Sequence, residues 1–281
     1  MHAVPTVNPG MTLLLGDVHG DFDIVNRHIY HAKKSGICVK QVVQFGDLGA
    51  SHHAFLTYFK RRSQQFAIPF FFIDGNHEDF FFLGSINRRF GEYVTYLERG
   101  SVHQFGWYNA LCLGGSAYMD PINTPPAAVI QRADIDRSLA HDPDTIDIIF
   151  SHDSPQEAGV SGRKEFKQYG QTGFSRGGEL LERYRPKLWV FAHHHQYYEC
   201  MVGDTRFVGL DLAARGYVLL GAGYYIKRVR HIAGALPDRD AIYCDRPGRS
   251  HPLEGALAEH VARKLSQWAA RALPRRRKDE G

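Results

Sequence analysis

Five short clusters of polar residues contain the side chains best suited to bind metal ions. The clusters cover residues 16–20, 46–49, 75–78, 151–153 and 192–195. They supply two aspartates, one asparagine and four histidines, namely Asp17, Asp47, Asn76, His19, His152, His193 and His195. A carboxylate can bridge two cations, while neutral imidazoles and an amide oxygen complete each coordination shell without adding much negative charge. This mixture of nitrogen and oxygen ligands suits Mn, Fe, Zn, Co or Ni better than Mg or Ca.

Each cluster lies just past the end of a short apolar run that predicts a buried strand. The runs cover residues 11–15, 41–45, 69–73, 146–150 and 188–191. Open α/β sheets place their sites where the carboxyl ends of neighbouring strands meet. We therefore expect the five clusters to converge on one crevice.

The motif order D-x-H, G-D-x-x, G-N-H-[DE], H and H-x-H resembles that of the calcineurin-like metallophosphoesterase superfamily, over roughly residues 11–220. The resemblance assigns one role to each of the matching residues. It implies that Asp17, His19 and His195 bind a first metal ion, that Asn76, His152 and His193 bind a second, that Asp47 bridges the two, and that His77 is the catalytic imidazole beside the leaving group.

The same resemblance implies a fold and a reaction. The expected fold is α/β, with a two-sheet metallophosphoesterase sandwich flanked by helices in four layers, α/β/β/α. The expected cofactors are two divalent metal ions, Mn²⁺ before Fe, Zn, Co or Ni. The expected reaction is hydrolysis of a phosphate ester by a hydroxide that bridges the two ions.

Two departures from the family pattern affect the expected substrate. Ala192 stands where the family usually has a glycine, which is tolerable unless the turn needs a positive φ. The segment after Asp47 also lacks the Asp-Arg-Gly or Ala-Arg-Gly that supplies a phosphate-clamping arginine in the protein-phosphatase and diadenosine-polyphosphatase branches. A phosphodiester or nucleotide substrate is therefore slightly preferred. A phosphomonoesterase, phosphoprotein phosphatases included, is the alternative, and a catalytically silent protein-binding scaffold is disfavoured because no expected ligand is replaced.

Three basic residues are weaker candidates for contacts to substrate. Arg176 precedes the start of a predicted helix, where an anion can bind. Arg88 lies in a segment that can overhang the crevice, and His53 lies close in sequence to Asp47. For His53, a place on the surface of a helix is the favoured interpretation.

The composition is that of an ordinary soluble globular protein. Of 281 residues, 43% are hydrophobic and 23% are charged. No apolar stretch approaches the length of a membrane span, and residues 1–10 lack a leader pattern, so we expect a cytoplasmic protein with no membrane partner. A net charge of +4 permits an anionic phosphate-ester substrate but does not favour nucleic acid as the partner. Nothing in the sequence specifies an oligomeric state.

The chain divides into three expected parts. Residues 1–10 are a lead-in, residues 11–222 form the metallophosphoesterase domain, and residues 223–281 form an extension with one helix, 253–272, and a basic tail, 275–278. Within the domain, helices are predicted over 21–35, 51–66, 127–139 and 179–184. A second sheet is predicted to begin within 93–117 and to include a hairpin of 197–202 with 205–210.

Overall fold

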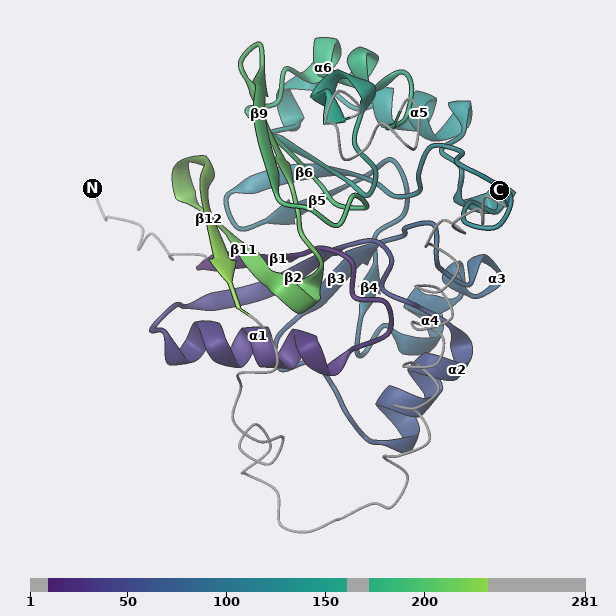
Figure 1. Ribbon diagram of the computed structural model, residues 1–281, viewed down its shortest axis with the longest axis vertical. Helices are drawn as coiled ribbons and strands as arrows, with labels where there is room; N and C mark the ends of the chain where they lie inside the picture. Colours follow the sequence, from purple (N-terminus) through teal and green to yellow (C-terminus); the bar gives the residue numbers. More distant parts are fainter. Residues whose placement is uncertain (1–9, 161–171, 232–281) are drawn as a thin grey trace, which may run out of the picture. The chain divides into compact units, whose positions relative to one another are not determined.

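A computed structural model describes residues 10–160 and 172–231 (Figure 1). The chain splits into two compact units, Met1–Pro237 and Asp238–Gly281, and all of the described residues belong to the first. The predicted helix 253–272, the basic tail and nearly all of the lead-in lie outside the described residues. No helix in the described ranges is long and apolar enough to cross a membrane.

Two six-stranded sheets form the centre of this unit. The first has the order β12 (Tyr225–Arg230), β11 (Gly216–Gly221), β1 (Met11–Leu15), β2 (Val39–Phe45), β3 (Phe70–Ile73) and β4 (Thr95–Tyr96). The second has the order β5 (Ser101–Phe105), β6 (Tyr108–Leu113), β7 (Ile148–Ser151), β8 (Leu188–Phe191), β10 (Thr205–Gly209) and β9 (Tyr198–Val202). In the first sheet, β1, β2, β3 and β4 are parallel, and β11 and β12 are added antiparallel at one edge. In the second sheet, β6, β7, β8 and β10 are parallel, and β5 and β9 pair antiparallel at the two edges.

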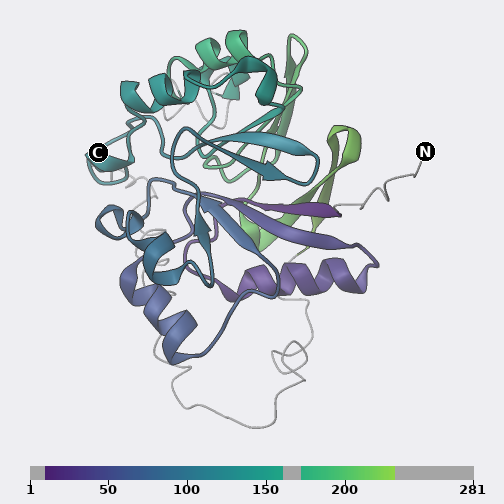
Figure 2. The same cartoon turned by 180° about the vertical axis from the view of Figure 1, so that it is seen from behind.

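Helices cover the outer face of each sheet, which gives the expected four layers (Figures 1 and 2). The first sheet carries α1 (Asp23–Lys34), α2 (His52–Phe55) with its π-helical continuation Leu56–Arg61, α3 (Phe80–Leu83) and α4 (Ile86–Phe90). The second sheet carries α5 (Arg132–Leu139) and α6 (Gly177–Tyr184). The predicted α/β two-sheet sandwich is therefore confirmed.

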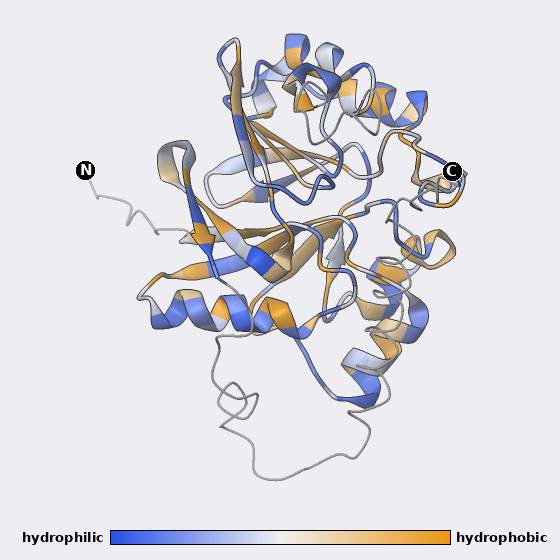
Figure 3. Ribbon diagram, in the orientation of Figure 1, coloured by the Kyte–Doolittle hydropathy of each residue, from blue (hydrophilic) through white to orange (hydrophobic). Residues whose placement is uncertain are grey.

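Side-chain alternation explains how the strands hold these layers together. Leu13 and Leu15 of β1 pack toward the helices, whereas Leu14 between them packs into the core that lies between the sheets. Val43 and Phe150 reach that same core from opposite sheets. Figure 3 shows the largely apolar colouring of the central strands, and the mixture of hydrophilic and apolar residues along α1. Strands buried on both faces are rigid supports for the loops that follow them.

Several boundaries differ from the predictions for local reasons. The second helix begins as expected, because Ser51 Oγ accepts the Ala54 N–H at 3.2 Å, but it ends at Arg61 and not at 66. The helix predicted over 127–139 begins only at Arg132, because the preceding prolines impose extended and 3₁₀ backbone through Val129. The first sheet also continues past residue 222, since β12 pairs with β11.

Candidate metal centre

The loops after β1 and β2 are bonded to each other through their backbones. The N–H groups of Val18 and His19 both donate to the Asp47 carbonyl, at 3.1 and 2.8 Å, and Gly20 N–H donates to the Leu48 carbonyl at 2.9 Å. Because β1 and β2 are parallel neighbours, both loops leave the sheet at the same edge. Asp17 and Asp47 are thereby held close together, and both are buried.

Asp47 also fixes the loop after β3. Its Oδ1 accepts the N–H groups of Asn76 and His77, at 2.8 and 2.9 Å, which leaves Oδ2 for another partner. A Cβ on Gly75 would lie 2.1 Å from Asp47 Oδ1, and one on Gly46 would lie 2.3 Å from the His152 ring. These two glycines are therefore required by close packing around the carboxylate.

Loops from the second sheet complete the site. The Ala192 N–H donates to the His152 carbonyl at 2.8 Å, which aligns the loops after β7 and β8. The His193 N–H donates to Asp17 Oδ1 at 3.2 Å and so joins the second sheet to the first. All five predicted clusters thus meet at one place, as the sequence indicated.

One group of ligand atoms, which we call the open half, surrounds Asp17. The ligand atoms of Asp17, His19, Asp47 and His195 all lie within 4.8 Å of one another. His195 Nε2 lies 2.7 Å from Asp17 Oδ2 and 3.2 Å from His19 Nε2. The side chains of His19 and His195 are each 38% exposed, so solvent reaches this half directly.

The second group, which we call the closed half, shares Asp47. Asp47, His152 and His193 also place ligand atoms within 4.8 Å of one another, and Asn76 Oδ1 lies 3.2 Å from His152 Nε2. The Asn76 amide is oriented by Nδ2, which donates to the Asn123 carbonyl at 2.8 Å, so its oxygen faces the site. His152 is fully buried and Asn76 is 2% exposed.

Hydrogen bonding fixes the tautomer of His152. Its Nδ1 lies 2.6 Å from the Phe45 carbonyl, which can only accept, so Nδ1 carries the proton. In the neutral ring, Nε2 then carries a lone pair. This lone pair faces two oxygens, Asn76 Oδ1 at 3.2 Å and Asp47 Oδ1 at 3.6 Å. Acceptors cannot face each other at these distances without a positive charge between them. A metal ion bound by these atoms satisfies that requirement.

The electrostatics of the site also favour positive charge. Burial lowers the pKa of His152, but the carboxylates of Asp47 and Asp17 outweigh burial and raise it above its usual value. Burial also lowers the pKa of His195, but the hydrogen bond and the charge of Asp17 outweigh burial and raise the pKa above its usual value. Burial raises the pKa of Asp17, yet the surrounding histidines hold it well below its usual range. The donor set and its charge therefore fit two divalent cations.

Four of these residues have unusual backbone conformations. His19, Asp47, His193 and His195 all have positive φ, between 49° and 66°, which is costly for residues other than glycine. Strain of this kind persists where the surrounding structure holds a functional group in place. Ala192 does not adopt a positive φ, which explains why alanine is accepted in place of the family's glycine.

Comparison with known protein families decides the family. Residues 11–197 match the family described as calcineurin-like phosphoesterase. This chain belongs to that family. A search of curated proteins found no match.

Solved structures of similar fold support the assignment of the calcineurin-like sandwich. TT1561 of Thermus thermophilus is 16% identical and has a TM-score of 0.57, over 79% of this chain and 98% of that one. Phosphopantetheinyl hydrolase from Mycobacterium tuberculosis is 12% identical, with a TM-score of 0.50 over 86% and 100% of the two chains. T. thermophilus sulfate thiohydrolase SoxB is 12% identical and has a TM-score of 0.52, over 93% of this chain and 62% of that one. At these identities the likeness concerns the fold alone.

His77 lies beside this calcineurin-like centre without joining either group of ligand atoms. Its Nε2 is 4.0 Å from Asp47 Oδ2, and its ring centroid is 5.7 Å from that of His19. The side chain is 46% exposed, so it can meet a molecule that arrives from solvent. Its position suits a contact to substrate better than a contact to a deeply held ion.

The three weaker candidates lie elsewhere. Arg176 forms ion pairs with Glu179, at 2.5 Å, and with Asp136, at 3.6 Å, in the outer helical layer. Arg88 and His53 are exposed on α4 and α2. Within the described residues, no hydrogen bond or ion pair joins any of the three to the candidate metal ligands. Their roles toward substrate remain predictions.

Glu78 supports the site in a way that the sequence left open. Its two carboxylate oxygens accept the N–H groups of Leu48 and Ala50, at 2.8 and 2.6 Å, and so brace the loop that carries Asp47. Burial, followed by the charge of Asp47, raises the pKa of Glu78 to about 8. Its place directly after His77 in the G-N-H-E motif was the available signal, but the motif does not show which groups the carboxylate contacts.

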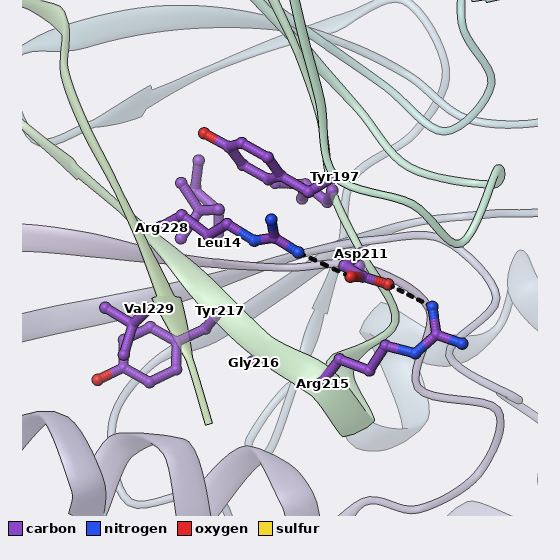
Figure 4. Close-up of a pocket in the computed structure, with 11 residues that line it drawn as sticks. Leu14, Tyr197, Asp211, Arg215, Gly216, Tyr217, Arg228 and Val229 are labelled. Atoms are coloured by element: carbon purple, nitrogen blue, oxygen red, sulfur yellow. Dashed lines mark hydrogen bonds and ion pairs between the residues drawn. The ribbon is translucent and has the colours of Figure 1, made fainter. Parts of the chain in front are cut away.

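An ion-pair network supports the open half from the side of β11 and β12, and the sequence did not reveal it. Asp211 Oδ1 and Oδ2 each lie 3.0 Å from an arginine, Arg215 and Arg228 respectively (Figure 4). Arg215 Nη1 also donates to the His195 carbonyl at 3.0 Å. The network therefore holds the strained backbone of His195 through Arg215.

Proposed function

We propose that this protein is a dinuclear-metal-dependent phosphoric ester hydrolase that acts on phosphodiesters or nucleotides. The observation that carries the proposal is the convergence of six potential metal-binding side chains around Asp47, with lone pairs that face one another. The open half would hold one ion through Asp17, His19 and His195, and the closed half the other through Asn76, His152 and His193. Two bound ions, for which we propose Mn²⁺, would supply Lewis acidity toward the phosphoryl group and activate water.

The chain's own residues provide orientation and proton transfer. Asp47 fixes the Asn76–His77 segment through two backbone hydrogen bonds, so its position and that of His77 are coupled. The exposed His77 imidazole can hold a phosphoryl oxygen or donate a proton to the departing oxygen. The preference for a diester rests on the missing arginine clamp, because a monoester dianion needs more cationic contacts than a diester monoanion.

An activity screen of metal-reconstituted protein tests this proposal. The substrates are a nitrophenyl monoester, a nitrophenyl diester, nucleoside polyphosphates and nucleic acid, each with and without chelator. Chelator-sensitive hydrolysis that is fastest on the diester or a nucleotide supports the proposal. Fastest hydrolysis of the monoester would replace it with a phosphomonoesterase, and equal rates after chelation would refute metal dependence.

A His77→Ala variant tests the proposed role of this residue. We expect turnover to fall by about a hundredfold, while two equivalents of metal remain bound. The loss should shrink for a nitrophenolate leaving group, which needs little protonation. Loss of one metal equivalent from this variant would show that His77 is a ligand. His103→Ala is the control, because His103 lies on the edge strand β5 and its ring nitrogen pairs with Ser101 Oγ, away from the candidate ligands.

A further inference from the structure

An exposed apolar loop adjoins the closed half of the metal centre. This segment, which we call the 117–124 loop, joins β6 to the helical layer of the second sheet. Three of its side chains face solvent: Tyr118 is 60% exposed, Met119 is 41% exposed and Ile122 is 90% exposed. Clustered exposed apolar side chains of this kind on a globular protein commonly mark a binding surface.

The loop is bonded near one end to a residue of the closed half and at the other end to the residue that follows His152. At its start, the Ala117 N–H donates to Asp153 Oδ2 at 2.9 Å, and Asp153 follows the proposed ligand His152. Near its end, the Asn123 carbonyl accepts from Asn76 Nδ2 at 2.8 Å. Both hydrogen bonds are made to residues of the polar clusters. Tyr118 and Ile122 each directly neighbour a residue that makes one of these bonds, so both side chains belong to the surroundings of the closed half.

The loop is also internally ordered. Asp120 Oδ1 accepts the N–H groups of Ile122 and Asn123, at 2.8 and 2.9 Å, and its Oδ2 accepts from Asn123 Nδ2 at 2.7 Å. Thr124 is fully buried and accepts the Met119 N–H at 3.3 Å. A loop held in this way presents its apolar side chains with little further loss of conformational entropy on binding.

We propose that the 117–124 loop binds the organic group of the substrate, and that this group carries an aromatic ring. The inference rests on the proposed function, because the phosphoryl group must first be anchored at the metal centre. A phosphate held there places the attached alcohol over the adjoining surface. Tyr118 offers a ring face for stacking, while Met119 and Ile122 offer flexible and branched apolar contacts. Aryl esters and nucleobase-bearing esters share this chemistry.

Two diesters with the same leaving group test the proposal. Methyl nitrophenyl phosphate and phenyl nitrophenyl phosphate differ only in the group that stays on the phosphorus. The preference for the phenyl ester, as the ratio of kcat/KM values, should fall about tenfold in a Tyr118→Ser, Ile122→Ser double variant, since the ring then loses much of its apolar contact. Hydrolysis of the methyl ester should change less than about twofold.

Matched variants separate a specific contact from a general disturbance. Tyr225→Ser is the control, because Tyr225 is a 47% exposed tyrosine on the edge strand β12. Tyr118→Phe should keep the phenyl preference, because it retains the ring. An unchanged ratio in the double variant, or an equal loss on both esters, would overturn the proposal. A nitrophenyl phosphodiester of thymidine distinguishes a nucleobase from a simple aryl group. The substrate whose kcat/KM falls more in the double variant carries the group that the loop binds better.

Binding of phosphonates separates this inference from the proposed function. Phenylphosphonate and methylphosphonate are not hydrolysed, and calorimetry on manganese-loaded protein measures their affinities directly. Phenylphosphonate should bind about tenfold more tightly than methylphosphonate to the wild-type protein, and this difference should be absent in the double variant. That result supports binding of the organic group by the 117–124 loop, even if no ester in the screen is hydrolysed. Equal affinities in the presence of diester hydrolysis would overturn the loop and leave the proposed function standing.

Discussion

The two halves of the metal centre share Asp47 but differ in how far they belong to the protein core. In the closed half, His152 is fully buried and is bonded to the Phe45 carbonyl at the end of β2. In the open half, His19 and His195 are each 38% exposed and are held mainly by backbone contacts and the Arg215 network. The same ligand types are therefore part of the core in one half and part of the surface in the other.

This difference predicts separate roles for the two halves in binding the metal ions. A ligand within the core cannot move without disturbing the packing around it, so the closed half is suited to retain its ion. Exposed ligands can rotate and rehydrate, so the open half is suited to exchange its ion and to admit the phosphoryl group. The 117–124 loop adjoins the closed half, so recognition of the organic group is expected on the more rigid side of the site.

The largest expected effect comes from the residue that the halves share. Asp47→Asn would remove the charge and one anionic oxygen of the proposed bridge, so both proposed ions should bind more weakly. We expect activity to fall on the order of a hundredfold or more. Metal analysis after dialysis, together with hydrolysis of a nitrophenyl diester, measures both losses. Full metal content at wild-type activity would show that Asp47 does not bridge the halves.

Substituting one histidine from each half tests the comparison directly. His152→Ala should lower the free energy of unfolding of the metal-free protein by about 2 to 4 kcal/mol, because it leaves a buried cavity and an unpaired carbonyl. His19→Ala should change it by less than about 0.5 kcal/mol, because the side chain is exposed. Urea titrations in chelator measure both values. Equal losses of stability would remove the distinction between the halves.

The support of the open half can be weakened without touching a ligand. Arg215→Ala removes the hydrogen bond to the His195 carbonyl, and affinity for the more weakly bound metal ion should fall about tenfold. Arg206→Ala is the control, because Arg206 pairs with Glu199 on the partly exposed β9–β10 hairpin. Calorimetric titration with Mn²⁺ resolves the two binding steps. A tenfold weakening of the tighter step alone would place Arg215 behind the other half.

The fold and the convergence of the polar clusters could be predicted from the sequence because both depend on local signals. Apolar runs identified the strands, and a polar cluster after each run identified a loop at one sheet edge, as with Leu13–Leu15 before Asp17. Interactions between distant segments gave no such signal. The contact of Arg215 with His195, and that of Asn123 with Asn76, join residues far apart in sequence, and neither arginine nor asparagine is distinctive in a loop.

The smallest expected effect concerns a buried histidine beneath the open half. His28 is fully buried, and its Nε2 donates to the Ala213 carbonyl at 2.7 Å, while the Ala213 N–H donates to the Asp17 carbonyl at 3.0 Å. Burial is the main cause that lowers the pKa of His28 to about 4, and His231 and His31 nearby add to it. Its Nδ1 is buried without a hydrogen-bond partner, so a proton there would find no acceptor.

The sign of the pH effect follows from proton binding. Between pH 6.5 and about 4 the unfolded chain binds a proton at His28 that the folded protein does not, so stability is complete above pH 6.5 and falls as the pH is lowered through this window. At pH 5.5 the loss should be about 1 kcal/mol. His28→Gln keeps a donor for the Ala213 carbonyl but cannot titrate, so it should lack this part of the pH dependence. Urea midpoints of both proteins in chelator, at pH 7.5 and 5.5, measure the difference. Parallel changes in the two proteins would show that His28 is not responsible for this part of the pH dependence.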